Sequence, residues 1–129
     1  MELELFDALA PGDDPAWPQV AVAVAQEVAQ GRCHQGILFC YTGTGVSIAA
    51  NKVPKVRAAL CADAETARGA RLWNDANVLC MSLRLTSIDV AREILDAWFS
   101  IRETDAPELS NLAWVNELDS HAKELAQGP

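Results

Sequence analysis

The amino-acid sequence predicts an α/β protein in which a parallel β-sheet lies between two layers of helices. Three observations lead to this three-layer α/β/α sandwich. Short apolar segments typical of strands alternate with longer amphipathic segments typical of helices. Their spacing leaves room for one helix between successive strands, which favours parallel pairing. With 129 residues, half of them hydrophobic, the chain is long enough to bury a core, so we expect one domain over residues 1–129.

The first expected elements are a short strand and a helix. Leu3–Leu9 alternates apolar and polar residues, which predicts a strand. The segment Pro11–Pro15 contains residues that interrupt regular structure. Pro18–Gln30 then carries valines spaced for one face of a helix, and Gly31 is a natural stop for it.

The stretch from Gly36 to Lys52 combines a strand, a glycine-containing loop and the start of a helix. Gly36–Cys40 is a short apolar run that suits a buried strand, and the loop Tyr41–Gly45 follows it directly. Glycines allow the backbone to approach a ligand closely, and the free N–H groups of a first helical turn point toward negative charge. This order of elements therefore predicts an anion site with a cysteine, Cys40, at the end of the strand.

The second half of the chain continues the alternation. Asp63 and Ser87 each precede an amphipathic segment and are expected to cap a helix. Because the carboxyl ends of parallel strands meet at one edge of the sheet, Cys40, Asp63 and Ser82 are expected near that edge. The predicted elements are the strands Val56–Cys61 and Asn77–Met81 and the helices Asp63–Trp73, Ser87–Phe99 and Leu109–Leu125.

Charge and cysteine content exclude several function classes. Lys and Arg number 10 against 18 Asp and Glu, so the net charge of −8 argues against a general nucleic-acid or membrane-surface binder. The four cysteines form no C-x-x-C pair, and with two histidines they complete no zinc pattern, so no metal is expected. The N-terminus lacks the apolar core of a signal peptide, and no stretch has the length of a membrane span. A cytoplasmic location is therefore expected.

A long central stretch resembles a known family. Residues 36–84 read GILFCYTGTGVSIAANKVPKVRAALCADAETARGARLWNDANVLCMSLR. They are similar to the ribose-5-phosphate isomerase B and galactose-6-phosphate isomerase family, whose pattern runs close to GILICGTGxGMSIAANK, IRAALC, SAR and HNDANVL. The likeness extends into the helices on either side and covers most of the chain.

The resemblance implies a fold, an activity and a set of site residues. It implies a flavodoxin-like, Rossmann-type sandwich with a C-terminal helix, which usually dimerises and shares its active sites between subunits. The family interconverts aldose and ketose phosphates without a metal or cofactor. Carried onto this sequence, Cys40 would be the base that moves a proton through an enediol, and Thr42 would assist at the sugar oxygen. Further substrate contacts would come from Tyr41, Gly43, Thr44, Gly45, Ser47 and Asn74.

The sequence also departs from the family pattern. The family's first strand, with its Asp-His-Ala-Gly segment, has no counterpart, so we expect the first family strand and helix to be missing. Trp73 and Tyr41 stand where the family has His and Gly, and acidic Thr104–Asn111 stands where it has phosphate-binding arginines. Either Leu3–Leu9 fills the central slot, placing Asp7 near the lost acid, or a partner chain supplies the strand or the missing residues. That partner would be a second copy or a paralogue.

Dinucleotide binding is a rival interpretation of the glycine loop. Gly43 and Gly45 follow a strand, and Asp63 lies about 20 residues on, as in the dinucleotide fingerprint. The third glycine of that fingerprint falls on Ile48, which weakens this interpretation.

Two further hypotheses stay within the family. The chain could be a catalytically impaired member that binds, regulates or completes a full-length isomerase subunit. It could also act on a changed substrate, with Tyr41 and Trp73 as new walls of the pocket. Arg68 and Arg71 are candidate anion partners, and Arg84 matches a family arginine.

Overall fold

The computed structural model describes residues 1–6 and 16–128, and it confirms the α/β/α sandwich. Helices and strands alternate through the body of the chain, and helices follow at the C-terminal end. In order, the elements are α1 (Trp17–Ala29), β1 (Gly36–Cys40), α2 (Thr44–Asn51), β2 (Ala58–Leu60), α3 (Ala64–Asn74), β3 (Val78–Ser82), α4 (Ile88–Ser100), α5 (Leu109–Leu118) and α6 (Ala122–Gln127).

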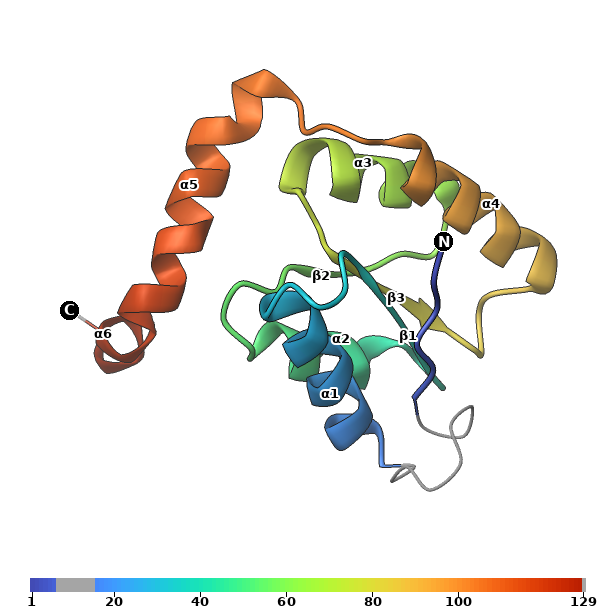
Figure 1. The fold of residues 1–129 in the computed structure, drawn as a ribbon, viewed down its shortest axis with the longest axis horizontal. Coiled ribbons are helices and arrows are strands. Elements are labelled where there is room, and N and C mark those ends of the chain that lie inside the picture. Colours follow the sequence, from blue (N-terminus) through green and yellow to red (C-terminus); the bar gives the residue numbers. More distant parts are fainter. Residues whose placement is uncertain (7–15, 129) are drawn as a thin grey trace.

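The three described strands form a parallel sheet in the order β1-β3-β2. Gly36 lies opposite Val78 at one end of the β1–β3 ladder, and Cys40 lies opposite Ser82 at the other. The carboxyl ends of the strands therefore share one edge, as the sequence predicted. In Figure 1, α1 and α2 cover one face of this sheet, and α3 and α4 cover the other.

The central strand β3 supplies both halves of the core. All five of its residues are buried. Val78 and Cys80 join the apolar cluster under α1 and α2, whereas Leu79 and Met81 join the cluster under α3 and α4. A strand buried on both faces has a continuous apolar run rather than an alternating pattern. This burial fixes the position of the loops that leave the sheet.

Local capping signals set the helix starts. The Asp63 carboxylate accepts the Thr66 N–H at 2.7 Å, and the Ser87 hydroxyl accepts the Val90 N–H at 3.2 Å. Both residues are the N-caps that the sequence predicted. The α1 helix has no side-chain cap and starts with Pro18 in its first turn.

The strand predicted over Leu3–Leu9 is absent from the described part of that segment. Residues 1–6 form no strand, and no backbone hydrogen bond joins them to the described sheet. Leu3 and Leu5 are 76% and 53% exposed, while Phe6 packs against the core under α1. β1 lies at an edge of the described sheet, yet residues 1–6 do not pair with it. An alternating pattern alone therefore does not determine whether a segment joins a sheet. Asp7 and the end of the predicted strand lie outside the described residues.

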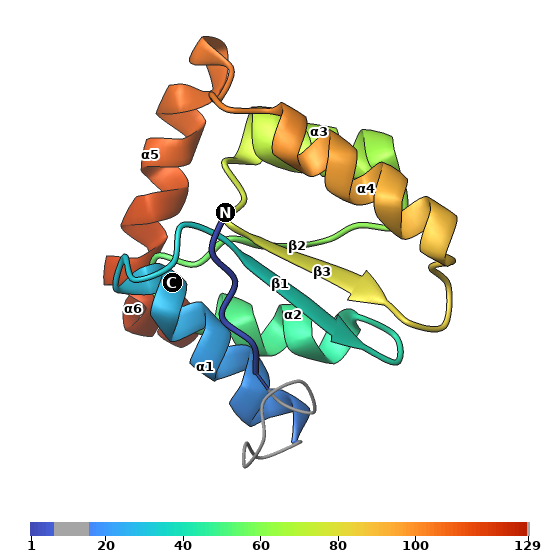
Figure 2. The same ribbon diagram turned by 45° about the vertical axis from the view of Figure 1, so that its right-hand side comes forward.

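The C-terminal helix α5 stands away from the sandwich in both views (Figures 1 and 2). It is attached near its end, where the Asp119 carboxylate accepts the Lys55 N–H at 2.8 Å. Leu112 is its one buried residue. Within the described ranges, no helix is long and apolar enough to cross a bilayer.

Candidate active site

The loop after β1 is held by its backbone. The Cys40 carbonyl accepts the Leu83 N–H at 3.0 Å, and the Tyr41 carbonyl accepts the Arg84 N–H at 2.9 Å. The buried Ser82 hydroxyl donates to the same Tyr41 carbonyl at 3.0 Å. Because these contacts use main-chain carbonyls, they fix the loop without engaging the Cys40 or Tyr41 side chains.

Gly43 brings the Cys40 sulfur to the start of α2. It is the N-cap of this helix, with a φ of 79° that side-chain-bearing residues rarely adopt. A Cβ here would lie 2.5 Å from Leu60 and 3.0 Å from the backbone of Met81 and Ser82. The Gly43 N–H donates to the Cys40 sulfur at 3.2 Å. The sulfur atom thus accepts a backbone N–H at a helix N-terminus, an arrangement that favours negative charge.

Two threonine hydroxyls lie beside this sulfur-bearing loop. The Thr42 and Thr44 hydroxyl oxygens are 2.8 Å apart and hydrogen-bonded to each other. Thr42 lies in the exposed loop, and Thr44 is the first residue of α2. A hydroxyl can donate and accept in the same step, so this pair can serve an oxygen that gains and loses a proton.

The rim of the site is largely apolar. Tyr41, Leu83 and Leu85 are 68%, 63% and 67% exposed, and they leave the carboxyl edge of the sheet on two adjoining loops. The Trp17 ring packs on Gly45, where an added Cβ would lie 3.0 Å from it. We call Tyr41, Leu83, Leu85 and Trp17 the apolar rim. Arg84, also exposed, adds one cation to it.

The thiols behind the loop differ from Cys40. The Ser47 hydroxyl lies near enough to Cys80 to lower the pKa of its thiol slightly, against the larger effect of burial. Burial raises the pKa of the Cys80 thiol to about 12 and that of Cys61 to about 11, and both side chains are fully buried. These two cysteines are therefore neutral core residues.

Asn74 lies at the opposite edge of the sheet. It is the last residue of α3, which begins beside the carboxyl edge and runs back to the start of β3. The neighbouring Trp73 ring is stacked by Arg68 at 5.6 Å from its centroid. The structure therefore gathers the loop residues Cys40–Gly45 in one place and leaves Asn74 at the far edge of the same chain.

The other residues considered for binding an anion or a dinucleotide already make contacts within the protein. Arg71 donates to the Ala76 carbonyl at 2.6 Å and lies over the ring of the buried Trp98. Its contacts are therefore structural. Arg68 pairs with Glu65. The Asp63 carboxylate caps α3, which removes the acid that a dinucleotide ribose would need.

One cluster has the composition of a metal site. The ligand atoms of Glu4, Glu27 and Cys33 lie within 4.8 Å of one another. However, Arg32 binds both oxygens of Glu27, at 2.7 and 2.8 Å. Burial and the two carboxylates raise the pKa of the Cys33 thiol. The Glu27 carboxylate, one of the three potential ligands, is thus paired with Arg32 at the end of α1.

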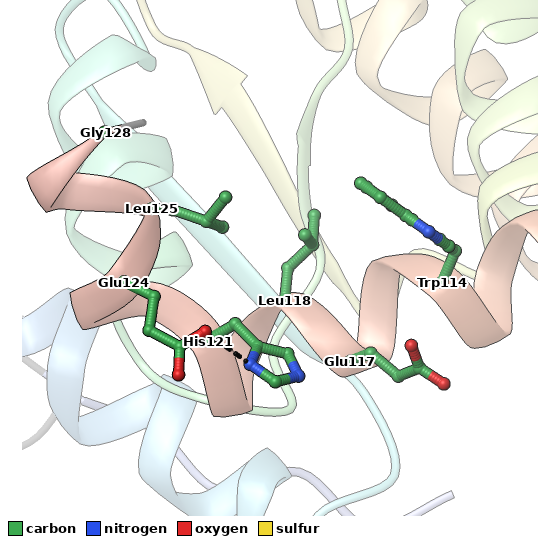
Figure 3. A pocket seen from close by; sticks show the side chains of 7 residues that line it. All are labelled: Trp114, Glu117, Leu118, His121, Glu124, Leu125 and Gly128. Carbon is green, nitrogen blue, oxygen red and sulfur yellow. Dashed lines mark hydrogen bonds and ion pairs between the residues drawn. The ribbon is translucent and has the colours of Figure 1, made fainter.

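A separate hollow of about 500 Å³ lies on α5 and α6. Figure 3 shows Trp114, Leu118 and Leu125 projecting toward it, with His121 hydrogen-bonded to Glu124 beside them. None of its lining residues belongs to the Cys40 loop, so this hollow is not the candidate active site.

The sequence analysis missed two contacts of the loop. Trp17 covers Gly45 from another helix, and the Ser82 hydroxyl supports the Tyr41 carbonyl from another strand. A polar residue that ends an apolar strand was the available signal for Ser82. An aromatic residue directly before Pro18 was the signal for Trp17.

Comparisons with known proteins agree on one family. The family model described as Ribose/Galactose Isomerase matches residues 2–111. D-erythrulose-4-phosphate isomerase 2 of Mycolicibacterium smegmatis is 40% identical over 106 residues, which are 82% of this chain and 68% of that protein. Ribose-5-phosphate isomerase B of Escherichia coli is 44% identical over 64% of this chain and 55% of its own length. The solved ribose-5-phosphate isomerase B of Clostridium thermocellum has a TM-score of 0.83 and 35% identity, covering 92% of this chain and 81% of that one.

Proposed function

The chain belongs to the ribose/galactose isomerase family, and from this we propose that it interconverts the aldose and ketose forms of a sugar phosphate through an enediol. The observation that carries the proposal is the Cys40 sulfur beside the Gly43 N–H at the start of α2. A proton-transfer group and anion-stabilising N–H groups are the two parts that enolisation requires.

In the proposed reaction, the Cys40 thiolate removes the proton from C2 of the aldose. The electron pair of that C–H bond forms the C1=C2 double bond, and the carbonyl oxygen on C1 becomes an enediolate. The amides of the first turn of α2 stabilise this charge, and the Thr42 hydroxyl exchanges a proton between the two oxygens. Cys40 then returns its proton to C1, which leaves the ketose and the original thiolate.

We further propose that two copies complete each site. Cys40 and Asn74 lie at opposite edges of one sheet, so one substrate can contact both only if Asn74 comes from another copy. Two surfaces support such pairing. The apolar rim lies on and beside the Cys40 loop. The C-terminal helices expose Leu109, Trp114 and Leu125 by 57%, 63% and 58%. A paralogous subunit could take the place of the second copy.

Arg84 is the proposed contact for the substrate phosphate. It is exposed at the mouth of the loop, its backbone is fixed by Tyr41, and its side chain has no ion pair among the described residues. An arginine can bind phosphate through two parallel hydrogen bonds. The free thiols suit the reducing cytoplasm, which we propose as the location.

The test is transfer of solvent deuterium to the sugar. We expect the wild-type protein to label ribose 5-phosphate, erythrulose 4-phosphate or galactose 6-phosphate in D₂O, and we expect Cys40→Ala to abolish labelling. Cys33→Ala, which removes a thiol outside the loop, should label normally. No labelling of any phosphorylated or free sugar, alone or with a full-length family member, would contradict the proposal.

Site sharing has its own test. Cys40→Ala and Asn74→Ala subunits, co-expressed with different tags and purified as hybrids, contain one intact site per pair if the site is shared. Such hybrids should recover about half of the wild-type activity. Hybrids as inactive as their parents would show that Asn74 does not act in trans.

A catalytically impaired partner protein is the second candidate function. The Trp73 ring, which stacks with the Arg68 guanidinium, offers no group for proton transfer near Asn74. Absence of labelling by this chain, together with increased activity of a full-length family member on mixing, would favour this second function.

A further inference from the structure

The turn between α3 and β3 is strained and short. Asp75, directly after Asn74, has a φ of 46°, which non-glycine residues seldom adopt. Its N–H closes the helix on the Ala70 carbonyl. This turn carries the Asn74 side chain, so whatever fixes the turn also fixes the direction in which Asn74 is presented.

Arg57 fixes this turn from outside the helix. Its Nε donates to the Asp75 carbonyl at 2.7 Å, and its Nη2 donates to the Asp75 carboxylate at 3.1 Å. Its Nη1 reaches the Lys55 carbonyl at 3.4 Å. Lys55 and Asp75 are the two non-glycine residues of positive φ in the described chain, so one guanidinium joins both. The Arg57 side chain is only 22% exposed, which strengthens these charge-assisted bonds.

Asn77 completes the network around Arg57. Its side-chain oxygen accepts the Arg57 N–H at 2.7 Å, and its side-chain nitrogen donates to the Lys55 carbonyl at 2.9 Å. Arg71 holds the Ala76 carbonyl from the other side at 2.6 Å. Within the described residues, every member of the turn from Asp75 to Asn77 is therefore tied down, whereas the Asn74 side chain makes no hydrogen bond. The network holds one exposed amide in a fixed place.

We propose that Arg57 is a positioning residue that acts through Asp75 to aim Asn74 into the site of the second copy. The inference rests on the proposed function, in which Asn74 contacts the substrate. It assigns to Arg57 a role in catalysis although Arg57 lies at the edge of the sheet remote from the Cys40 of its own chain.

The test is a double-mutant cycle on Arg57 and Asn74. Arg57→Lys keeps the charge but loses the planar guanidinium that donates several hydrogen bonds at once. It should lower kcat/KM about tenfold, and Asn74→Ala should lower it to a similar extent. The double variant should be no slower than Asn74→Ala alone, because Arg57 acts only through Asn74. Arg32→Gln, which removes the ion pair between the exposed Arg32 and Glu27 of α1, should leave activity unchanged. If the fold-losses of kcat/KM in the two single variants multiply in the double variant, Arg57 acts independently of Asn74 and the inference is overturned.

Hybrid subunits provide a readout that simple destabilisation would not give. Arg57→Lys mixed with Cys40→Ala should recover activity, because both changes damage the same site and leave the other intact. Arg57→Lys mixed with Asn74→Ala should not recover, because each site then carries one damaged turn. If Cys40→Ala and Asn74→Ala complement each other but both Arg57→Lys mixtures recover, the positioning role fails and the proposed function stands.

A measurement without substrate covers the case of an inactive chain. Hydrogen exchange of the backbone amides of residues 74–77 should speed up about tenfold in Arg57→Lys and stay unchanged in Arg32→Gln. Asp75→Asn, which tolerates the left-handed conformation, should speed exchange less. Unchanged exchange in Arg57→Lys would show that Arg57 does not hold the turn.

Discussion

At the carboxyl edge of the sheet, the Cys40 loop is held through its backbone, whereas at the amino edge the Asn74 turn is held through side chains. At the carboxyl edge, the main-chain carbonyls of Cys40 and Tyr41 accept the hydrogen bonds that hold the loop. At the amino edge, the side chains of Arg57 and Asn77 provide the hydrogen bonds that hold the turn.

This difference predicts different responses to mutation. At the carboxyl edge, a substitution should change the chemistry and leave stability unchanged, unless it alters the backbone. At the amino edge, a side-chain substitution should cost stability directly, because it removes hydrogen bonds from donors and acceptors that are in part buried.

The largest effect is expected where the backbone of the loop itself is changed, in Gly43→Ala. The new Cβ meets the Met81–Ser82 backbone in a strained conformation, so the free energy of unfolding should fall by about 3 kcal/mol. Displacement of the Gly43 N–H should also lower kcat/KM about 100-fold. Urea denaturation and the isomerase assay measure the two effects.

Gly31→Ala is the matched control for this variant. Gly31 has a φ of 78°, but nothing lies within 4 Å of the added Cβ. Only the conformational strain remains, so the cost should be about 1 kcal/mol with activity unchanged. Equal costs at the two glycines would show that the close packing of the loop does not matter.

At the amino edge, Asn77→Ala should lower the free energy of unfolding by about 2 kcal/mol. It removes the acceptor of the Arg57 N–H and the donor to the Lys55 carbonyl. Asn111 is exposed, and its amide donates to the Glu108 carboxylate. Asn111→Ala should therefore change stability by less than about 0.5 kcal/mol. Similar values for the two asparagines would remove the distinction between the edges.

Arg84→Ala tests whether a side chain at the carboxyl edge can be removed without loss of stability. We expect the KM for a phosphorylated substrate to rise about tenfold, with the free sugar unaffected, because one charge-assisted contact is lost. The unfolding free energy should stay constant, since the backbone N–H that binds Tyr41 is kept. Arg92→Ala on the exposed side of α4 is the control. A stability loss in Arg84→Ala alone would contradict the comparison.

Local signals in the sequence predicted most of the fold. Gly36–Cys40 had the observed bounds of β1, and Asp63 and Ser87 cap the helices that they were expected to cap. Each of these features depends on residues within a few positions of one another. The glycine loop was predictable for the same reason.

Features that depend on distant partners were not predictable. β2 is shorter than expected because the Arg57 N–H bonds to the Asn77 side chain instead of a strand. The alternation of Leu3–Leu9 could not show whether this segment pairs with a strand, and residues 1–6 do not pair with the edge strand β1. The placement of Asn74 far from Cys40 required the strand order, which pairing across the whole sheet decides.

The smallest expected effect concerns the two buried thiols behind the Cys40 loop. Burial raises the pKa values of Cys61 and Cys80 to about 11 and about 12, so the folded protein keeps two protons that the unfolded chain releases above about pH 9. The free energy of unfolding should therefore be insensitive to these groups below about pH 8 and fall as pH rises beyond about 9. The loss should be under about 1 kcal/mol for each thiol by about pH 9.5.

Urea denaturation of the wild type and of Cys80→Ala between about pH 7 and about pH 9.5 isolates the contribution of Cys80, because the remaining titrating groups are common to both. A parallel pH dependence in the two proteins would mean that folding does not raise the pKa of the Cys80 thiol. The core behind the loop would then be open to solvent.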